Sequence, residues 1–277
     1  MASETARYIE VATDFANQLS QRSLELPSMP GVARNVFTLA DSDHASAQGL
    51  VEIIQRDQKF AAHLLRAVNA PAFRGIDEIN NLQQAIARLG LSEVREIAMA
   101  IAIGDVFIGS PPYDYLVDRA RKHGLRTALW AKLIADEASL DPQTAHLCGL
   151  LHNIGMPLVV KHAWELDNSL TEFDILQLLN RFETLTGQLI SESWRLPPTI
   201  CMVIRHHQDF ASAPQAGDYA AAVNMASLIG HAQMNQALDL DVLPAFPATT
   251  YLNLSRDNLR GLIEHEQQID EEVAGLT

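Results

Sequence analysis

Apolar side chains recur along most of this chain at steps of three and four residues, which is the spacing of one face of an α-helix. The stretch after Asp57 is typical, because Asp57 can cap a helix and apolar positions then follow at helical intervals. These positions are Phe60, Ala61, Leu64, Leu65 and Val68. Alternating patterns of the kind that strands show are nearly absent. The pattern therefore predicts an all-α protein.

Capping residues and prolines mark where the helices should begin. The predicted starts are Ser46, Asp57, Asp141-Pro142, Thr171 with Asp174 as a capping box, Pro197-Pro198, and Ser255 with Asn258. Gly90 is expected to stop a helix at its C′ position. The last helix is expected to run from Ser255 to about Val273.

The same pattern predicts two helical lobes preceded by a separate helix. We expect an N-terminal helix over 1–21, a first lobe over 22–108 and a second lobe over 109–277 with a C-terminal helix. The boundary is placed at Gly109-Ser110-Pro111-Pro112, which is the strongest run of helix-breaking residues in the chain.

The composition argues against several classes of protein. The 277 residues carry a formal net charge of −14, which argues against a nucleic-acid binder, since such proteins neutralise phosphates with Lys and Arg. No apolar run approaches the ~20 residues that span a bilayer. Residues 1–14 contain three carboxylates and no apolar core, unlike a secretory signal. The two cysteines, Cys148 and Cys201, lie within apolar helical patterns. We expect a cytoplasmic protein that contacts neither nucleic acid nor membrane.

Ten histidines offer the clearest candidate chemistry. His123 lies within the long helix predicted over 113–138, His152 ends the next helix, and His206 and His207 end the helix that starts at Pro198. Imidazoles from separate helices are the usual way in which a helical bundle builds a metal site. The remaining histidines are expected to be incidental surface or core residues. They are His44, His63, His146, His162, His231 and His265.

The segment Leu151-His152-Asn153-Ile154-Gly155 resembles the Leu-His-Asp-Ile-Gly signature of the HD phosphohydrolase superfamily. In that family a first histidine, the His-Asp doublet and a later aspartate hold a divalent metal that activates water. By position His123 matches the first histidine and His152 the doublet histidine. Asn153 stands in place of the doublet aspartate, and Ser227 in place of the later one. The resemblance therefore implies a degenerate metal site.

Further motifs are similar to the HDOD branch of that superfamily, the HD-related output domain of bacterial signalling proteins. In chain order they are Leu26–Pro30, Arg56-Asp57, Ala61–Asn69, Phe73–Gly75, Leu82–Leu91 and Trp194–Pro197 followed by His206-His207. Glu183 stands where many members carry a histidine. The similarity covers about residues 22–230, and it implies a helical module whose second lobe is a degenerate HD-type bundle.

Replacing two carboxylates by Asn153 and Ser227 should weaken the binding of a hard cation by several kcal/mol, about the size of close charge interactions in proteins. The vestigial pocket would then comprise His123, His152, Asn153, Glu183, His206, His207 and Ser227. No cofactor is expected. The alternative is a divalent metal, either zinc, iron or manganese, held by His123, His152 and His206.

The function predicted from the resemblance is non-enzymatic: a bacterial regulatory module of signal transduction that acts through signalling-protein partners. One alternative is a metal-dependent phosphohydrolase acting on a nucleotide or cyclic dinucleotide. A second alternative is a sensor that binds a small molecule or nucleotide in the vestigial pocket. The sequence leaves the partner, the input signal and the oligomeric state open.

Overall fold

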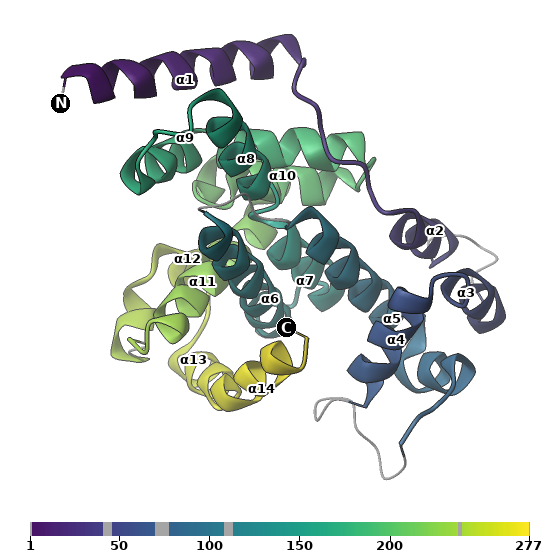
Figure 1. The fold of residues 1–277 in the computed structure, drawn as a ribbon. Coiled ribbons are helices and arrows are strands. Elements are labelled where there is room, and N and C mark those ends of the chain that lie inside the picture. Colours follow the sequence, from purple (N-terminus) through teal and green to yellow (C-terminus); the bar gives the residue numbers. More distant parts are fainter. Residues whose placement is uncertain (1, 41–45, 70–77, 108–112, 238–239, 277) are drawn as a thin grey trace.

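The computed structural model describes residues 2–40, 46–69, 78–107, 113–237 and 240–276, and within these ranges every regular element is a helix (Figure 1). The all-α prediction is confirmed. The predicted boundary at 109–112 and the Phe73–Gly75 motif lie outside the described residues. No helix in the described part combines the length and apolar character needed to cross a membrane.

The helices before the predicted boundary form two groups. α1 (Ala2–Gln21) lies apart from its sequence neighbours and packs against α8 and α9 (Figure 1). The next four helices pack on one another around α5. They are α2 (Gly31–Ala40), α3 (Ala47–Ile54), α4 (Gln58–Val68) and α5 (Leu82–Val106).

The helices after the boundary surround α6, which has its most extensive contacts with α7 and α11. They are α6 (Asp114–Glu137), α7 (Pro142–Leu151), α8 (Met156–Leu166), α9 (Glu172–Ser193), α10 (Pro198–His206), α11 (Gly217–Met234), α12 (Pro247–Tyr251), α13 (Arg256–Ile263) and α14 (Glu266–Leu276). Two 3₁₀ turns, η1 (Phe210–Ser212) and η2 (Leu240–Ala245), connect them.

The local capping signals are confirmed. The side chains of Ser46, Asp57 and Asp141 each accept a hydrogen bond from a backbone N–H in the first turn. Thr171 with Asp174, and Ser255 with Asn258, form complete capping boxes. Each of these bonds joins residues three positions apart, so it needs no tertiary contact to form.

One predicted helix end is confirmed and one needs correction. Gly90, at φ 79°, has non-helical geometry between two helical segments of α5, so the first segment ends there as predicted. The single helix predicted from Ser255 to Val273 is two helices, α13 and α14. The break allows Gln233 of α11 to donate a hydrogen bond of 3.0 Å to the backbone carbonyl of Glu266, at the first turn of α14.

Apolar side chains form a large core around α6 and a smaller one between α2 and α5. Trp130, fully buried on α6, lies in the large core, and Leu50 and Ile54 of α3 lie in the smaller one. The large core also takes in Phe15 of α1 and Phe37 of α2. The N-terminal helices therefore anchor on the bundle formed by the C-terminal half of the chain.

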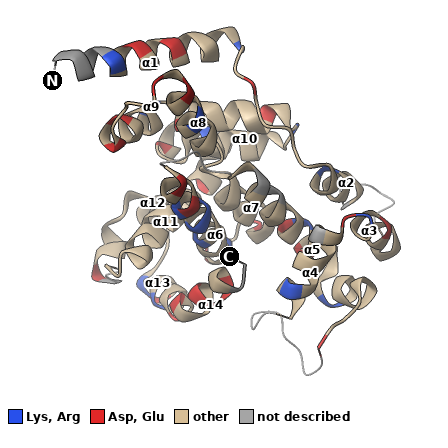
Figure 2. Ribbon diagram, viewed as in Figure 1, with Lys and Arg blue, Asp and Glu red and all other residues tan. Residues whose placement is uncertain are grey.

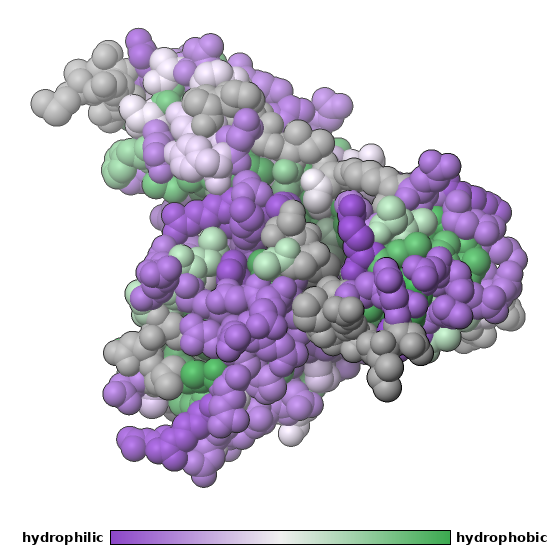
Figure 3. Space-filling model, turned by 60° about the horizontal axis from the view of Figure 1, so that its bottom comes forward, coloured by the Kyte–Doolittle hydropathy of each residue, from purple (hydrophilic) through white to green (hydrophobic). Residues whose placement is uncertain are grey.

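Charged side chains are distributed over the outside of the molecule. Basic residues gather on α6, whereas acidic residues lie along α1 and along α14 beside α6 (Figure 2). An ion pair of 2.6 Å between Arg126 and Asp270 joins α6 to α14. The face shown in Figure 3 is mostly hydrophilic, with small separate apolar areas.

A charged cluster joins α5 to the bundle. Nζ of Lys132 on α6 lies 3.1 Å from a carboxylate oxygen of Glu93 and 3.1 Å from one of Glu96, both on α5. The Glu96 side chain is only 1% exposed, and Nδ1 of His146 on α7 lies 3.5 Å from its Oε2. Burial raises the pKa of Glu96, and Lys132 opposes that rise.

We expect Lys132→Met to lower the free energy of unfolding by about 3 kcal/mol, because it leaves the buried Glu96 carboxylate without its cation. Urea unfolding at pH 7 measures the change. Lys122→Met is the matched control, since Lys122 pairs with Asp118 at the surface and should cost under about 0.5 kcal/mol. Adding Glu96→Gln to Lys132→Met should recover part of the loss. Equal losses in the two single variants would contradict this role of Lys132.

Candidate functional site

Four histidine side chains from four helices form a continuous row of ring contacts. His207, after α10, meets His152, after α7, at a centroid distance of 5.1 Å. His152 meets His123 on α6 at 5.2 Å, and His123 stacks on His231 of α11 at 3.8 Å. His207, His152 and His123 are buried, whereas His231 is exposed. This histidine row therefore runs from the bundle interior to the surface.

The histidine row differs from the predicted set at two positions. His206, a predicted metal ligand, makes no ring contact with the row, and its Nδ1 lies 3.0 Å from Ser212 Oγ near the surface. Its neighbour His207 takes the inner position instead. His231, predicted to be incidental, belongs to the row. The sequence held one signal for His231, since it follows Ser227 by four residues and so shares its helix face.

Backbone carbonyls orient the two innermost rings. Nδ1–H of His152 donates to the carbonyl of Gly149 at 2.6 Å, and Nδ1–H of His207 donates to the carbonyl of Ile204 at 3.1 Å. In a neutral imidazole the other nitrogen then carries the lone pair. Both carbonyls lie three residues earlier in the same helix end, so the ends of α7 and α10 hold these rings in the same way.

His123 lies between α6 and α11. Its Nε2 is 3.1 Å from Ser227 Oγ on α11 and 3.4 Å from Thr127 Oγ1 on its own helix. Its Nδ1 is buried without a hydrogen-bond partner. The structure thus brings together His123 and Ser227, the residues that match the family's first histidine and later aspartate.

The histidine row is uncharged at neutral pH. Burial lowers the pKa of His123 to about 3 and that of His207 to about 4. Burial also lowers the pKa of His152 well below its ordinary range, and the neighbouring histidines lower it further. The pKa of His231, at the outer end of the row, is lowered as well, by desolvation of its ring against His123 and by Arg119. A cation placed among these rings would find no anionic side chain from the described residues.

Asn153 is buried beside the row and is held by its amide nitrogen. Its Nδ2 donates to the carbonyl of Ala120 on α6 at 2.8 Å. Its Oδ1 is buried without a partner. An ionised aspartate has no N–H or O–H to donate to the Ala120 carbonyl. An amide therefore fits this position better than a carboxylate does.

The backbone of Glu183 on α9 lies close to Gly155, the last residue of the signature segment Leu151–Gly155. A Cβ placed on Gly155 would lie 2.1 Å from the carbonyl oxygen of Glu183. Burial raises the pKa of the Glu183 carboxyl to about 8, so it is mostly protonated at pH 7. No hydrogen bond or ion pair joins this carboxyl to the row among the described residues. It adds no negative charge where a metal would need it.

The donors present do not fit the metal that the family resemblance implies. A hydrolytic divalent ion prefers anionic oxygen ligands, whereas the row offers neutral imidazoles, one amide oxygen and one hydroxyl. Within the described ranges no three His, Cys, Asp or Glu side chains are grouped as metal ligands. No chemical step is therefore assigned to a metal here.

A small cavity adjoins Asn153. It measures about 90 Å³ and is bounded by α4, α5, α6 and α7, with His63 and Arg121 among its lining residues. Ligand sites for small molecules commonly measure 300–1,000 Å³. The volume that the described residues enclose is too small for a nucleotide.

Comparison with known proteins identifies the family. The HDOD domain model matches residues 26–210. An uncharacterized protein from Treponema pallidum (strain Nichols) is 22% identical over 223 residues, which are 76% of this chain and 43% of that protein. The chain thus spans less than half the length of that relative.

Two solved structures share the fold. A provisionally named metal-dependent phosphohydrolase from Shewanella amazonensis SB2B has a TM-score of 0.78 and 19% identity, covering 98% of this chain and 100% of that one. A provisionally named signal transduction protein from Marinobacter aquaeolei VT8 has a TM-score of 0.64 and 18% identity, covering 99% and 66%. Given the family model matched over residues 26–210 and this shared helical fold, the chain belongs to the HDOD domain family.

Proposed function

We propose that this chain is a non-enzymatic regulatory module of bacterial signal transduction that acts through protein partners. The observation that carries the proposal is the neutral histidine row, in which an amide and a hydroxyl replace both family carboxylates. His123, His152, Asn153 and Ser227 have the positions of a phosphohydrolase site without its charge. A domain with this fold and a neutral centre can bind partners, but it lacks the groups that hold and activate a hydrolytic metal.

The residues beside the signature support the same proposal. Met156-Pro157 follow Gly155, where many active members have a lysine, so no side chain there can offset charge on a transferring phosphoryl group. The name of the Marinobacter aquaeolei relative points to signalling. The name of the Shewanella amazonensis relative points to the alternative, a metal-dependent phosphohydrolase.

Turnover with added metal separates the two functions. The purified chain would be assayed with cyclic di-GMP and with bis(p-nitrophenyl) phosphate in excess manganese or iron(II), and its metal content would be measured. We expect no more hydrolysis than the His152→Ala variant shows. Stoichiometric metal together with turnover that His152→Ala abolishes would overturn the proposal and establish the phosphohydrolase.

We expect Asn153→Asp to lower the free energy of unfolding by about 2 kcal/mol at pH 7, since the carboxylate loses the hydrogen bond to Ala120 and is charged at a buried position. Thermal and urea unfolding would measure the loss. Ser227→Asp is the companion variant, because Ser227 is only half-buried and should tolerate the charge better. An Asn153→Asp protein as stable as the unmodified chain, and newly able to bind manganese, would contradict this interpretation of Asn153.

Partners can be sought directly in cells of the source bacterium. The tagged chain would be cross-linked and purified, and the captured proteins identified by mass spectrometry. We expect a histidine kinase, a diguanylate cyclase or a transcription factor among them. Capture of metabolic enzymes alone, or of nothing above background, would count against a signalling role.

A further inference from the structure

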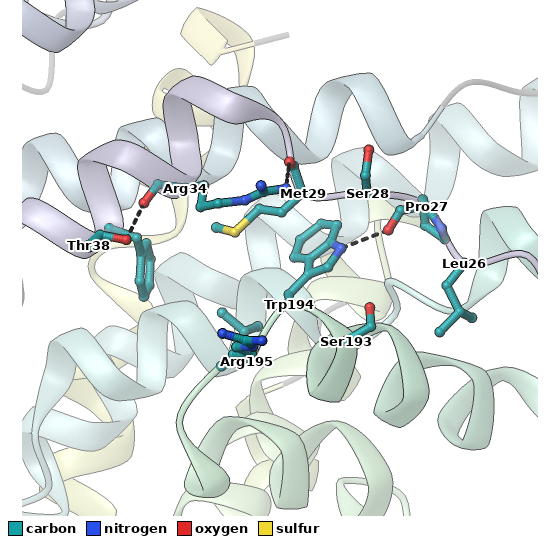
Figure 4. A pocket seen from close by; sticks show the side chains of 11 residues that line it. Leu26, Pro27, Ser28, Met29, Arg34, Thr38, Ser193, Trp194 and Arg195 are labelled. Atoms are coloured by element: carbon teal, nitrogen blue, oxygen red, sulfur yellow. Dashed lines mark hydrogen bonds between the residues drawn. The ribbon is translucent and has the colours of Figure 1, made fainter. Parts of the chain in front are cut away.

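A cavity of about 670 Å³ lies where the segment before α2 meets the end of α9 (Figure 4). One wall is formed by residues 26–38 and the other by residues 193–196. Nε1–H of Trp194 donates to the carbonyl of Pro27 at 2.8 Å and ties the walls together across 167 positions of sequence. The cavity is separate from the histidine row, and none of its lining residues belongs to the row.

Two arginines face this cavity from opposite walls, Arg34 from α2 and Arg195 from the turn after α9 (Figure 4). Arg34 Nη2 donates to the carbonyl of Met29 at 2.9 Å, which holds its guanidinium beside the segment before α2. Neither arginine forms an ion pair with any residue in the described ranges. Each guanidinium has five N–H donors, more than its hydrogen bonds to the described residues use.

The charge of the cavity is opposite to that of the chain. Although the protein has a net charge of −14, no acidic residue in the described part of the chain lines the cavity. The neighbouring carboxylate, Glu192, pairs with Arg22 at 3.6 Å. The hydroxyls of Ser193 and Thr38 donate to helix carbonyls. Two guanidinium groups that form no ion pair with a described residue are a typical recognition set for phosphate oxygens.

The rest of the wall is apolar, and the cavity is larger than a phosphate ion needs. Side chains of Leu26, Met29, Phe37, Trp194 and Leu196 line it. Its volume lies within the 300–1,000 Å³ that is usual for small-molecule sites. A ligand that matches it must carry an apolar or aromatic body as well as an anionic group.

We propose that this cavity binds a phosphorylated small molecule of nucleotide size. Its phosphoryl groups contact Arg34 and Arg195, and its organic body rests on the apolar wall. A bound ligand bridges the segment before α2 and the end of α9. α10 begins three residues after Arg195 and ends beside His207. A ligand bound at Arg195 therefore also affects the position of α10 in the bundle. Use of this binding as the input signal rests on the proposed regulatory function, whereas binding itself does not.

Isothermal titration calorimetry on the full chain tests the site. The probes are GTP, ATP and pyrophosphate, with adenosine as the uncharged analogue. We expect a nucleoside triphosphate to bind at least tenfold more tightly than either adenosine or pyrophosphate. Arg34→Gln and Arg195→Gln should each weaken that binding at least tenfold, in line with the loss of one charge-assisted contact. Arg256 on α13 is also exposed, and Arg256→Gln should leave the binding unchanged.

Three results would overturn the proposal: no heat from any phosphate compound at millimolar concentration, binding that both arginine variants retain, or tighter binding of a hexaglutamate peptide than of the nucleotides. The last result would assign the cavity to an acidic segment of a partner protein. Hydrolysis of the bound nucleotide that depends on His152 would instead contradict the regulatory function and leave the binding site in place.

Discussion

Between pH 6.5 and pH 4 the free energy of unfolding is expected to fall, because four buried histidines stay neutral in the folded protein. They are His123, His146, His152 and His207. Burial lowers the pKa of each below the ordinary 6.5 that it regains on unfolding. In this window the unfolded chain binds protons that the folded chain excludes. Each histidine then costs up to about 1.4 kcal/mol per pH unit.

The sign follows from the pKa values. The stability that these histidines contribute is complete above pH 6.5, and it is lost as the pH falls toward the folded pKa values of about 3 to 4. Glu183 acts in the opposite sense, because its pKa is raised to about 8 and the folded protein holds a proton that the unfolded chain releases above its ordinary 4.5. Burial likewise raises the pKa values of Glu96 and Glu272.

Variants separate these opposing contributions. His207→Gln should remove the uptake of one proton on unfolding, since the folded pKa of His207 is about 4. The free energy of unfolding should then fall by about 3 kcal/mol less between pH 6.5 and pH 4 than it does in the unmodified chain. Urea unfolding at half-unit pH steps measures the slope. His265→Gln is the control, because His265 is exposed on the surface. Parallel pH profiles for His207→Gln and the unmodified chain would show that His207 is not held neutral by burial.

Substituting Gly155 by alanine is expected to lower the free energy of unfolding by about 3 kcal/mol, near the upper end for overpacking. A Cβ there would lie 2.1 Å from the carbonyl oxygen of Glu183 and 2.6 Å from the amide nitrogen of Gly187. Both are backbone atoms of α9, so a rotamer change cannot relieve the contact. The φ of −73° at Gly155 is open to any residue, so the glycine is required for space alone.

Gly261→Ala is the matched substitution, because a Cβ at that position of α13 meets nothing within 4 Å. It should stabilise the protein by about 0.5–1 kcal/mol through helix propensity. Thermal unfolding of both variants distinguishes the effects. If Gly155→Ala unfolded at the same temperature as the unmodified chain, then α9 would not pack against the signature segment as closely as the structure has it.

The histidine row shows where prediction from the chain was sufficient and where it was not. His152 and Asn153 could be found because the signature is contiguous, and His123 because one family pattern covers it. The choice between His206 and His207 could not be made, because adjacent residues at a helix end point in directions about 100° apart. Only the packing of α10 against α7 turns His207 toward His152 and leaves His206 beside Ser212.

The local sequence pattern was enough to predict the all-α class, most helix starts and the family. The capping bonds of Ser46, Asp57 and Thr171 join residues three positions apart, so the interacting groups are read from adjacent sequence. The packing of α1 on α9, the row of four rings and the cavity between Pro27 and Trp194 depend instead on groups far apart in the chain. Such contacts form only when every intervening helix has packed, and no short stretch of sequence encodes that outcome.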